Sequence, residues 1–384
     1  MIGFALSEEQ RMFQKTAHDF AGKELRPIAL ECDRMERYPE DLLRKGHQAG
    51  LISFHFPEEY GGAGIADRVS WAIVREELSW GCPGLCIAMM ASNLAATPIL
   101  YMGTPEQKKK FLTRLSDPEK TTLAAMAMTE PDSGSDVSSI RTKAVKKGGR
   151  YILNGTKTFI TNGGIADVTV VYARMDGSSG MGGMTAFIVD GRPKGFSMGK
   201  KEDKMGIRAS HTAELILEDV EVPEANRLGP EGDAFMLSMR MFDESRIMVA
   251  ALALGIGRRA LEIAVDYANE RKQFGKPIKA FEGVSFKLAD MATRLEAARL
   301  LTWQAAWLAS QDGGRFTKES AMAKYYATEA SCWVADQAIQ ILGGYGYMHD
   351  YSVEKLYRDS RVFRIFEGTS EVMRLIVARE LYRK

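Results

Sequence analysis

The stretch Arg364–Arg379, RIFEGTSEVMRLIVAR, places a single carboxylate next to the start of a helix. Apolar residues in 372–377 recur at a spacing that suits one buried helical face. Thr369 or Ser370 is a good N-cap, because its hydroxyl accepts a hydrogen bond from a free amide of the first turn. Glu367 then stands just outside the helix N-terminus, between an apolar pair and a Gly-Thr-Ser corner.

Two roles are open to Glu367. In the first it is a general base in a water-poor pocket, and the rest of the chain places a cofactor and a substrate beside it. In the second it only complements the positive end of the helix dipole. Short motifs have little specificity, so this stretch alone favours the second role.

The composition is that of a soluble globular protein. The chain has 384 residues, of which 45% are apolar and 26% charged, enough for two or three domains. Lys and Arg number 51 and Asp and Glu 50, a net charge of +1. This balance gives no electrostatic reason to expect nucleic acid or an anionic membrane as a partner.

Cysteine and histidine usage gives no sign of disulfides or metals. The four cysteines form no CxxC pair, and the five histidines show no metal-ligand spacing. The N-terminus lacks a basic segment followed by an apolar one, and no uninterrupted apolar run is long enough to span a bilayer. We therefore expect a cytoplasmic protein with free thiols, no metal and no membrane association.

The chain divides into a helical, a strand-rich and a second helical part. Residues 1–120 read as helices, with capping-box spacing at Ser7 and Thr104. Residues 121–233 carry short strand-like runs between Gly-, Asn- and Pro-rich loops, which favours an antiparallel β-barrel or sandwich. Residues 234–384 hold three long amphipathic patterns and the helix after Glu367, which predicts a C-terminal four-helix bundle. The predicted class is α+β, mostly α.

One apparent nucleotide motif is discarded. Gly255–Ala260, GIGRRA, matches the GxGxxA form of a dinucleotide fingerprint. A Rossmann site needs a second strand ending in an acidic residue about 20 residues further on, whereas here a helical pattern continues to Lys272. The glycines are interpreted as the close approach of two helices.

Four short segments carry further candidate site residues. Thr129–Asp136 and Phe159–Gly164 offer hydroxyls, amides and an aromatic face suited to a flat, hydrogen-bonding cofactor ring, but each segment taken singly is more typical of a surface turn. Arg271–Gly275 either binds a pyrophosphate or ends a helix. Gln340–Gly346 offers a close backbone approach or a helix C-cap.

Taken together, the motifs resemble those of the acyl-CoA dehydrogenases, in particular the short- and medium-chain type. The resemblance runs through nearly the whole chain, in the family's order and spacing and with the same α/β/α division. It rests on the segments PEEYGG (57–62), TEP (129–131), GSD (134–136), NGTK (154–157), ITNG (160–163), VEVP (220–223), RKQFG (271–275), ILGG (341–344) and EGT (367–369).

The resemblance implies that FAD binds between the middle domain and the C-terminal bundle, with help from a neighbouring subunit. Phe159 would cover one face of the flavin, and the Thr161 hydroxyl would reach its N5 atom. The other implied cofactor contacts are Met126, Met128, Thr129 and Ser135 around the flavin, Arg271, Phe274, Gln340, Gly343 and Gly344 at the pyrophosphate and adenine ends across a subunit interface, and Thr369 and Glu371 at the start of the last helix.

The resemblance also implies the substrate contacts and the base. The positions that match contacts with the CoA part of the substrate are Ser135, Asp243, Arg246 and Arg379. Glu367 matches the base that removes the α-proton of the thioester while flavin N5 takes the β-hydride. The thioester oxygen would accept hydrogen bonds from a ribityl hydroxyl and from the base's own backbone N–H.

Other branches of the family place the base on an earlier helix, at the position of Ser245, which cannot serve as a base. Glu244 is adjacent, but one residue rotates a helical side chain by about 100°. The resemblance therefore favours Glu367.

The sequence narrows the substrate only partly. Leu85 stands where glutaryl-CoA dehydrogenases carry an arginine, which disfavours a dicarboxylic substrate. Met89 and Met90 fall on the helix expected to floor the acyl pocket and favour a short, branched or cyclic acyl group. A homotetramer and electron-transfer flavoprotein as electron acceptor are implied by the resemblance alone. The alternatives are a flavin acyl-CoA oxidase, a desaturase of unusual regiochemistry, or a non-catalytic helical scaffold.

Overall fold

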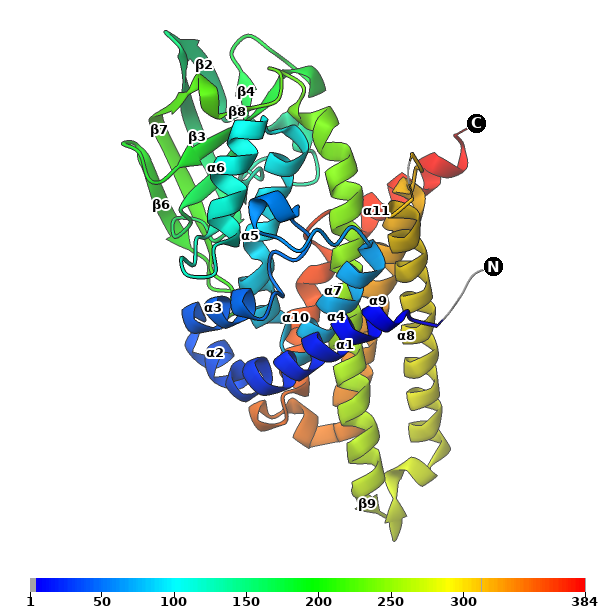
Figure 1. The fold of residues 1–384 in the computed structure, drawn as a ribbon. Coiled ribbons are helices and arrows are strands. Elements are labelled where there is room, and N and C mark those ends of the chain that lie inside the picture. Colours follow the sequence, from blue (N-terminus) through cyan, green and yellow to red (C-terminus); the bar gives the residue numbers. More distant parts are fainter. Residues whose placement is uncertain (1–4, 312, 384) are drawn as a thin grey trace.

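The computed structural model describes residues 5–311 and 313–383. A strand-rich middle part lies to one side of a long helical bundle (Figure 1). The predicted class, a mostly helical α+β fold with helical, β and helical parts in that order, is confirmed.

The N-terminal part is built from six α-helices. Both predicted capping boxes are present: the Ser7 hydroxyl accepts from the Gln10 amide, and Thr104 accepts from Gln107. A π-helical turn at Ala21–Leu25 and a 3₁₀ turn at Arg26–Ile28, which contains Pro27, follow the first helix. The helices are α1 (Glu8–Phe20), α2 (Ala29–Met35), α3 (Glu40–Gln48), α4 (Arg68–Gly81), α5 (Pro83–Met102) and α6 (Pro105–Ser116).

Helix α5 is buried and almost entirely apolar. Among the described residues, α5 is the one helix that is both long enough and apolar enough to cross a membrane. However, 61% of its most apolar window is buried inside the fold, as in the core helix of a soluble protein. Ser92 and Asn93 interrupt its apolar run, so the helix contains no long uninterrupted apolar stretch.

The middle part is one sheet with strand order β6-β7-β3-β2-β4-β5-β8, and β1 pairs with β4. Most pairings are antiparallel, as predicted, but β1 and β2 both run parallel to β4. Parallel neighbours need a long connection, which the roughly 40 residues between β1 and β4 supply. The strands are β1 (Ala124–Ala127), β2 (Lys143–Lys147), β3 (Arg150–Thr161), β4 (Val168–Met175), β5 (Met184–Asp190), β6 (Phe196–Lys201), β7 (Thr212–Pro223) and β8 (Arg227–Leu228).

The C-terminal part contains the three predicted long helices and the predicted terminal helix. A short helix, α10, was not predicted; it packs on α9 before the Glu367 corner. The elements are α7 (Ala234–Glu270), the hairpin strands β9 (Lys272–Gln273) and β10 (Lys276–Pro277), α8 (Glu282–Ala309), α9 (Thr317–Leu342), α10 (Val353–Arg361) and α11 (Ser370–Leu381).

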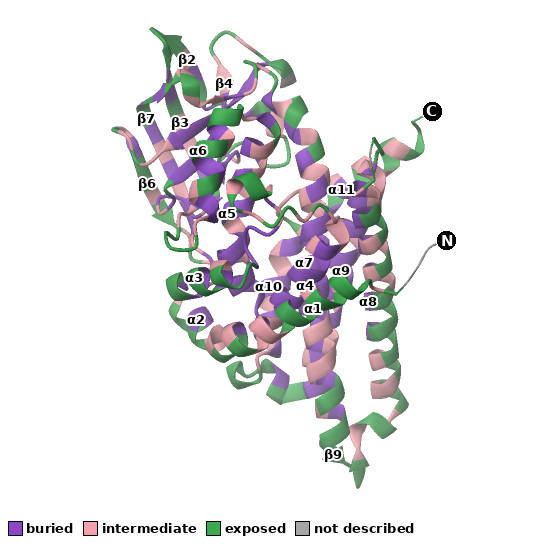
Figure 2. Ribbon diagram, viewed as in Figure 1, coloured by how far each residue is buried: buried purple, intermediate pink, exposed green. Residues whose placement is uncertain are grey.

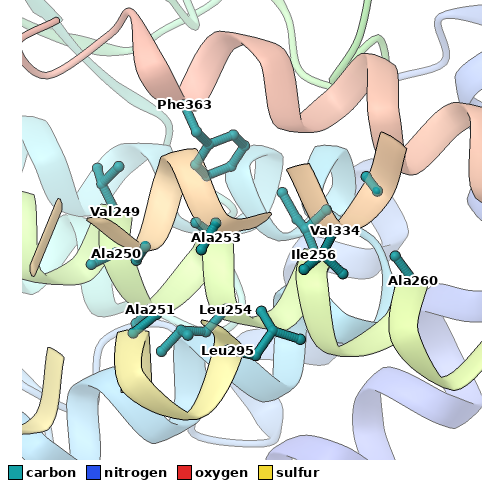
Figure 3. Packing of buried hydrophobic residues seen from close by; sticks show 14 of the residues in the cluster. Val249, Ala250, Ala251, Ala253, Leu254, Ile256, Ala260, Leu295, Val334 and Phe363 are labelled. Atoms are coloured by element: carbon teal, nitrogen blue, oxygen red, sulfur yellow. The ribbon is translucent and has the colours of Figure 1, made fainter. Parts of the chain in front are cut away.

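Helix α7 is the central rod of the fold. It runs from the middle part to the β9–β10 hairpin at the opposite end of the molecule (Figure 1), about 55 Å for its 37 residues. Its centre is buried (Figure 2), and small side chains such as Ala250 and Ala253 let Leu295 of α8 and Val334 of α9 pack closely around it (Figure 3).

The GIGRRA segment lies within α7, which rules out the Rossmann interpretation of that motif. A Cβ at Gly255 would lie 2.3 Å from the Glu76 carbonyl oxygen and 2.7 Å from the Trp80 amide nitrogen of α4. The two helix backbones therefore meet at this glycine, as the sequence interpretation required.

Candidate active site

Glu367 lies at a sharp corner between a 3₁₀ turn (Val362–Arg364) and helix α11. Its φ is +55°, unusual for a residue with a side chain, and that of Gly368 is +98°. Thr369 caps α11, because its hydroxyl accepts from the Val372 amide at 3.2 Å. The corner sets the Glu367 side chain apart from the helix that follows, so its position is fixed by other elements.

Helix α7 supplies the direct contact to the Glu367 carboxylate. The Ser245 hydroxyl donates to Glu367 Oε2 at 2.9 Å. Burial raises the pKa of Glu367 above its usual value; the bond from Ser245 and the charges of Arg246 and Lys324 oppose that rise. The carboxyl is thus held in a place where its proton affinity exceeds that of an exposed glutamate.

Glu244 points elsewhere, as the helical rotation predicted. It is buried, and its Oε1 lies 3.3 Å from Arg68 Nη2 on α4. This ion pair occupies the carboxylate in the contact between α7 and the N-terminal helices.

Lys324 of α9 approaches the corner from the other side. It is fully buried, and its Nζ donates to the Gly368 carbonyl oxygen at 2.5 Å. Lys324 is not among the residues predicted from the sequence. A lysine amid alanines on a buried helical stripe, AMAKYYA, is the signal that would have found it.

Asp243 and Arg246, the predicted CoA contacts on α7, form a half-buried pair. Arg246 Nη1 lies 2.8 Å from Asp243 Oδ1, and the Thr317 hydroxyl donates to Asp243 Oδ2 at 2.5 Å. The Arg246 side chain lies close to the corner. Its Nε is 4.0 Å from the position that a Cβ would take at Gly368. The structure therefore brings this pair together with Glu367.

The predicted flavin-facing residues of the middle part lie in β3 and in and just after β1. The pairing of β3 with β7 shifts register at Phe159, and the side chain points outward. Its φ is +56°, and 65% of its surface is exposed. Beside it, the Thr158 amide donates to the Thr129 carbonyl at 2.9 Å. This contact brings the end of β1, with the predicted Met126, Met128 and Thr129, next to Phe159 and Thr161.

A buried ion pair supports that surface from behind. Lys157 Nζ donates to Glu130 Oε1 at 2.7 Å and to the Met128 carbonyl at 2.9 Å. Burial lowers the pKa of Lys157 to about 8, and the charge of Glu130 opposes the shift. Sequence reasoning missed this pair, since the two residues lie 27 positions apart.

Helix α7 connects the middle part to the Glu367 corner. The Tyr172 hydroxyl of β4 and the Ser238 hydroxyl of α7 lie 2.8 Å apart. Ser238 precedes Ser245 by two turns, about 10 Å along the helix. Helix α7 therefore carries both the contact to the sheet and the residue that holds the Glu367 carboxylate.

A third group of predicted residues lies at the far end of α7. Arg271 and the turn after α9 border an open hollow of about 500 Å³, and Arg271 lies over the Tyr345 ring at 5.5 Å. Phe274 projects from the β9–β10 hairpin with 92% of its surface exposed. The lining residues are Tyr267, Arg271, Gln273, Ile278, Ile341, Leu342, Gly343, Gly344, Tyr345 and Met348.

The remaining predicted residues are exposed and make few contacts. Ser135 lies on an exposed loop, and Gln340 is exposed near the end of α9. Glu371 lies in the first turn of α11. Arg379 lies near the end of that helix, with its Nε 3.9 Å from Glu380 Oε1. In residues 5–311 and 313–383 no cluster of three potential metal ligands occurs.

Sequence comparison identifies the family. Models of the acyl-CoA dehydrogenase N-terminal, middle and C-terminal domains match residues 7–119, 125–220 and 232–382. An acyl-CoA dehydrogenase of Bacillus subtilis (strain 168) is 48% identical, with 98% of each chain covered. A 3-(aryl)acrylate reductase of Clostridium sporogenes is 44% identical, covering 98% of this chain and 99% of the relative.

Structure comparison agrees. The butyryl-CoA dehydrogenase of Megasphaera elsdenii matches with a TM-score of 0.95 and 44% identity. A structure described as an electron transferring flavoprotein of Acidaminococcus fermentans matches with a TM-score of 0.96 and 45% identity. Each match covers the full length of both chains. An FAD complex of PigA matches with a TM-score of 0.94 and 30% identity, covering 99% of each chain. The chain belongs to the acyl-CoA dehydrogenase family and is an FAD-dependent oxidoreductase.

Proposed function

We propose that this protein removes two hydrogens from the α and β carbons of a short, saturated acyl-CoA thioester, with Glu367 as the base. The observation that carries the proposal is the half-buried Glu367 carboxylate, whose Oε2 accepts the Ser245 hydrogen bond at 2.9 Å. That bond orients the carboxyl and leaves Oε1 for the α-proton.

The environment of Glu367 suits proton abstraction. Desolvation raises its pKa, which strengthens it as a base, while Ser245, Arg246 and Lys324 favour its ionised form. Among the described residues, no protein group accepts a hydrogen bond from the Glu367 backbone N–H. We infer that this N–H donates to the thioester oxygen and stabilises the enolate-like charge that develops there.

The residues of this chain fit a flavin. Phe159 offers an exposed aromatic face at a β-bulge, next to the Thr161 hydroxyl and the backbone of Thr129. Bound FAD supplies the hydride acceptor. The chain's part is to hold the ring between this surface and Glu367 and to exclude water from the space between them.

The far hollow fits the pyrophosphate and adenine portion of the cofactor. A Cβ at Gly343 or Gly344 would meet no protein atom within 4 Å and would instead occupy open space, and Arg271 supplies a cation. Arg271 follows Ser245 by 26 residues, about 40 Å along α7. One extended cofactor does not span that distance, so we propose that the hollow serves the flavin of a second subunit.

The outer face of α8 supports an oligomer, which we propose is a homotetramer. Phe286, Leu300 and Trp307 are exposed and recur at multiples of seven residues, which makes one apolar stripe along the helix. A second copy packed on this stripe would remove it from water.

The acyl pocket is proposed to take a short monocarboxylic chain. Leu85 is fully buried and offers no charge to a distal carboxylate. Met89 packs toward α3, with its Cε 2.6 Å from a Cβ placed at Gly46, and both methionines are buried, Met90 at 8% exposure. The likeness to a butyryl-CoA dehydrogenase supports a short substrate.

We further propose electron-transfer flavoprotein as the electron acceptor and the cytoplasm as the location. The likeness to the Acidaminococcus fermentans structure supports the first. The buried state of α5 and the bacterial relatives support the second.

Anaerobic bleaching of the bound flavin tests the function. Butyryl-CoA should bleach the wild-type flavin, and Glu367→Gln should keep FAD but lose bleaching. Ser331→Ala, which removes a buried hydroxyl on α9 with no hydrogen-bond partner among the described residues, is the matched control and should bleach normally. Bleaching by Glu367→Gln at the wild-type rate would refute the assignment, and oxygen uptake during turnover would identify an oxidase.

A further inference from the structure

Lys324 is a fully buried lysine whose ammonium faces the back of the Glu367 corner. Its side chain reaches from the middle of α9, and its Nζ donates to the Gly368 carbonyl oxygen at 2.5 Å. An ammonium has three donors, and Gly368 supplies the one acceptor that the described residues give it. A buried charge is costly unless it is paired, so a second favourable interaction is needed to keep this amine ionised.

The strongest favourable charge on this amine is that of Glu367. Among the charges that act on Lys324, Glu367 contributes most in favour of the ammonium, followed by Glu329 of α9 and Glu371 of α11, and Arg246 of α7 opposes it. The influence is mutual, because Lys324 also lowers the pKa of Glu367. Burial still prevails at the amine and lowers its pKa to about 8.

We propose that Lys324 is a positioning residue for the catalytic base: it holds the Gly368 carbonyl in place by a hydrogen bond and keeps a positive charge near the Glu367 carboxylate. This inference rests on the proposed role of Glu367. The Lys324 bond fixes the peptide that follows Glu367, and Ser245 fixes the side chain. Together they hold a left-handed corner that its own backbone preference disfavours.

The charge has a separate use. An apolar pocket alone would protonate the base and make it unable to accept the α-proton. A cation at this corner keeps the carboxylate ionised and does not compete for its oxygens, since the structure gives Lys324 a bond to the Gly368 carbonyl instead. The base therefore combines desolvation with ionisation at the working pH.

Two substitutions separate these roles. Lys324→Met removes both the donor and the charge at similar volume, and Lys324→Gln keeps a donor for the Gly368 carbonyl without the charge. The rate of flavin bleaching is measured in the holoenzyme as a function of pH. In both variants the acid limb of this profile should move to higher pH by about one unit, which is a tenfold change in the ionisation constant of the base. The limiting rate at high pH should fall at least tenfold in Lys324→Met and less in Lys324→Gln.

A second readout does not depend on turnover. The infrared carboxyl band of protonated Glu367, identified by its loss in Glu367→Gln, should titrate at higher pH in Lys324→Met than in the wild type. Unchanged band midpoint and acid limb in Lys324→Met would overturn the inference and leave a structural lysine. A wild-type enzyme that no acyl-CoA bleaches would instead overturn the proposed function, and the band midpoints would still decide the role of Lys324.

Discussion

Ser245 and Glu367 are 122 positions apart in the chain, and the Ser245 hydroxyl donates a 2.9 Å hydrogen bond to the Glu367 carboxylate. The bond joins the central helix α7 to the corner before α11. It also shows that position 245, where the resemblance places the base of other branches, and position 367 open onto the same space. A carboxylate at either position would reach the same space. In this chain, Ser245 orients the carboxylate of Glu367.

Ser245→Ala should weaken the base without removing it. Ser245 lowers the pKa of Glu367, so its loss raises that pKa and leaves more of the base protonated below neutral pH. A hydrogen bond to a charged group is worth about 1.5–3 kcal/mol, so a shift of about one pKa unit is expected. The rate of flavin bleaching should fall up to about tenfold at pH 6 and recover toward pH 9. A pH-independent loss would contradict this role.

Glu367→Gln should become more stable, relative to the wild type, as pH rises. The folded-state pKa of Glu367 lies above its ordinary value of 4.5, so the folded protein binds the proton more tightly than the unfolded chain. Stability from this group is therefore present below pH 4.5 and is lost as pH rises through the folded-state pKa. The glutamine has no such loss. Thermal unfolding at pH 5 and pH 8 should show the difference in Tm, variant minus wild type, growing by about 1–3 °C. A constant difference would show that the folded-state pKa is not raised.

Gly255→Ala should loosen the contact between α4 and α7. The new methyl group would meet the Glu76 carbonyl at 2.3 Å, and backbone atoms yield only if the helices separate. A loss of about 1–3 kcal/mol in the free energy of unfolding is expected by chemical denaturation. Gly283→Ala is the control, since its Cβ meets no atom within 4 Å and alanine favours a helix. Equal effects at the two sites would contradict the close approach.

Phe159→Asn should weaken FAD binding while leaving the backbone intact. Asparagine tolerates the left-handed φ at this position but removes the exposed aromatic face. The lost apolar contact corresponds to about 1.5–3 kcal/mol, or roughly 10–100-fold in the Kd for FAD measured by titration of the apoprotein. Phe159→Trp keeps an aromatic face and should retain the cofactor. Wild-type affinity in Phe159→Asn would exclude a stacking role.

Trp307→Glu should break the proposed oligomer. The tryptophan is 55% exposed on the apolar stripe of α8, and a charge there would be buried at an interface. Sedimentation should show smaller particles than the wild type. Met12→Glu changes an exposed methionine on α1, outside the stripe, and should leave the mass unchanged. An unchanged mass in Trp307→Glu would place the interface elsewhere.

The sequence predicted the long elements because their signals are local. The capping boxes at Ser7 and Thr104 and the three long helices of the bundle depend on residues close together in the chain. It missed the parallel pairings of β1 and β2 with β4, since pairing partners are set by the whole sheet. It also missed α10, a nine-residue helix too short for a clear periodic pattern.

The candidate site divides in the same way. Glu367 was selected from its corner motif and the resemblance, and the structure adds the neighbours that give the carboxylate its properties. Ser245 is 122 positions away, and the Lys324 bond to Gly368 spans 44. The sequence marks Lys324 only by the alanines around it, and neither contact can be read from it, because hydroxyl and amine contacts across a bundle depend on how its helices dock.

The length of α7 has a consequence for how the enzyme loads its cofactor. The helix carries Ser245 about three turns from its start and leads to Arg271 just past its end, about 40 Å away. If each flavin is bound by the Ser245 region of one α7 and the Arg271 region of the α7 of another subunit, subunit assembly and cofactor occupancy are linked equilibria. Dilution should release FAD and lower specific activity, excess FAD should drive the subunits back together, and the apparent affinity for FAD should rise with protein concentration.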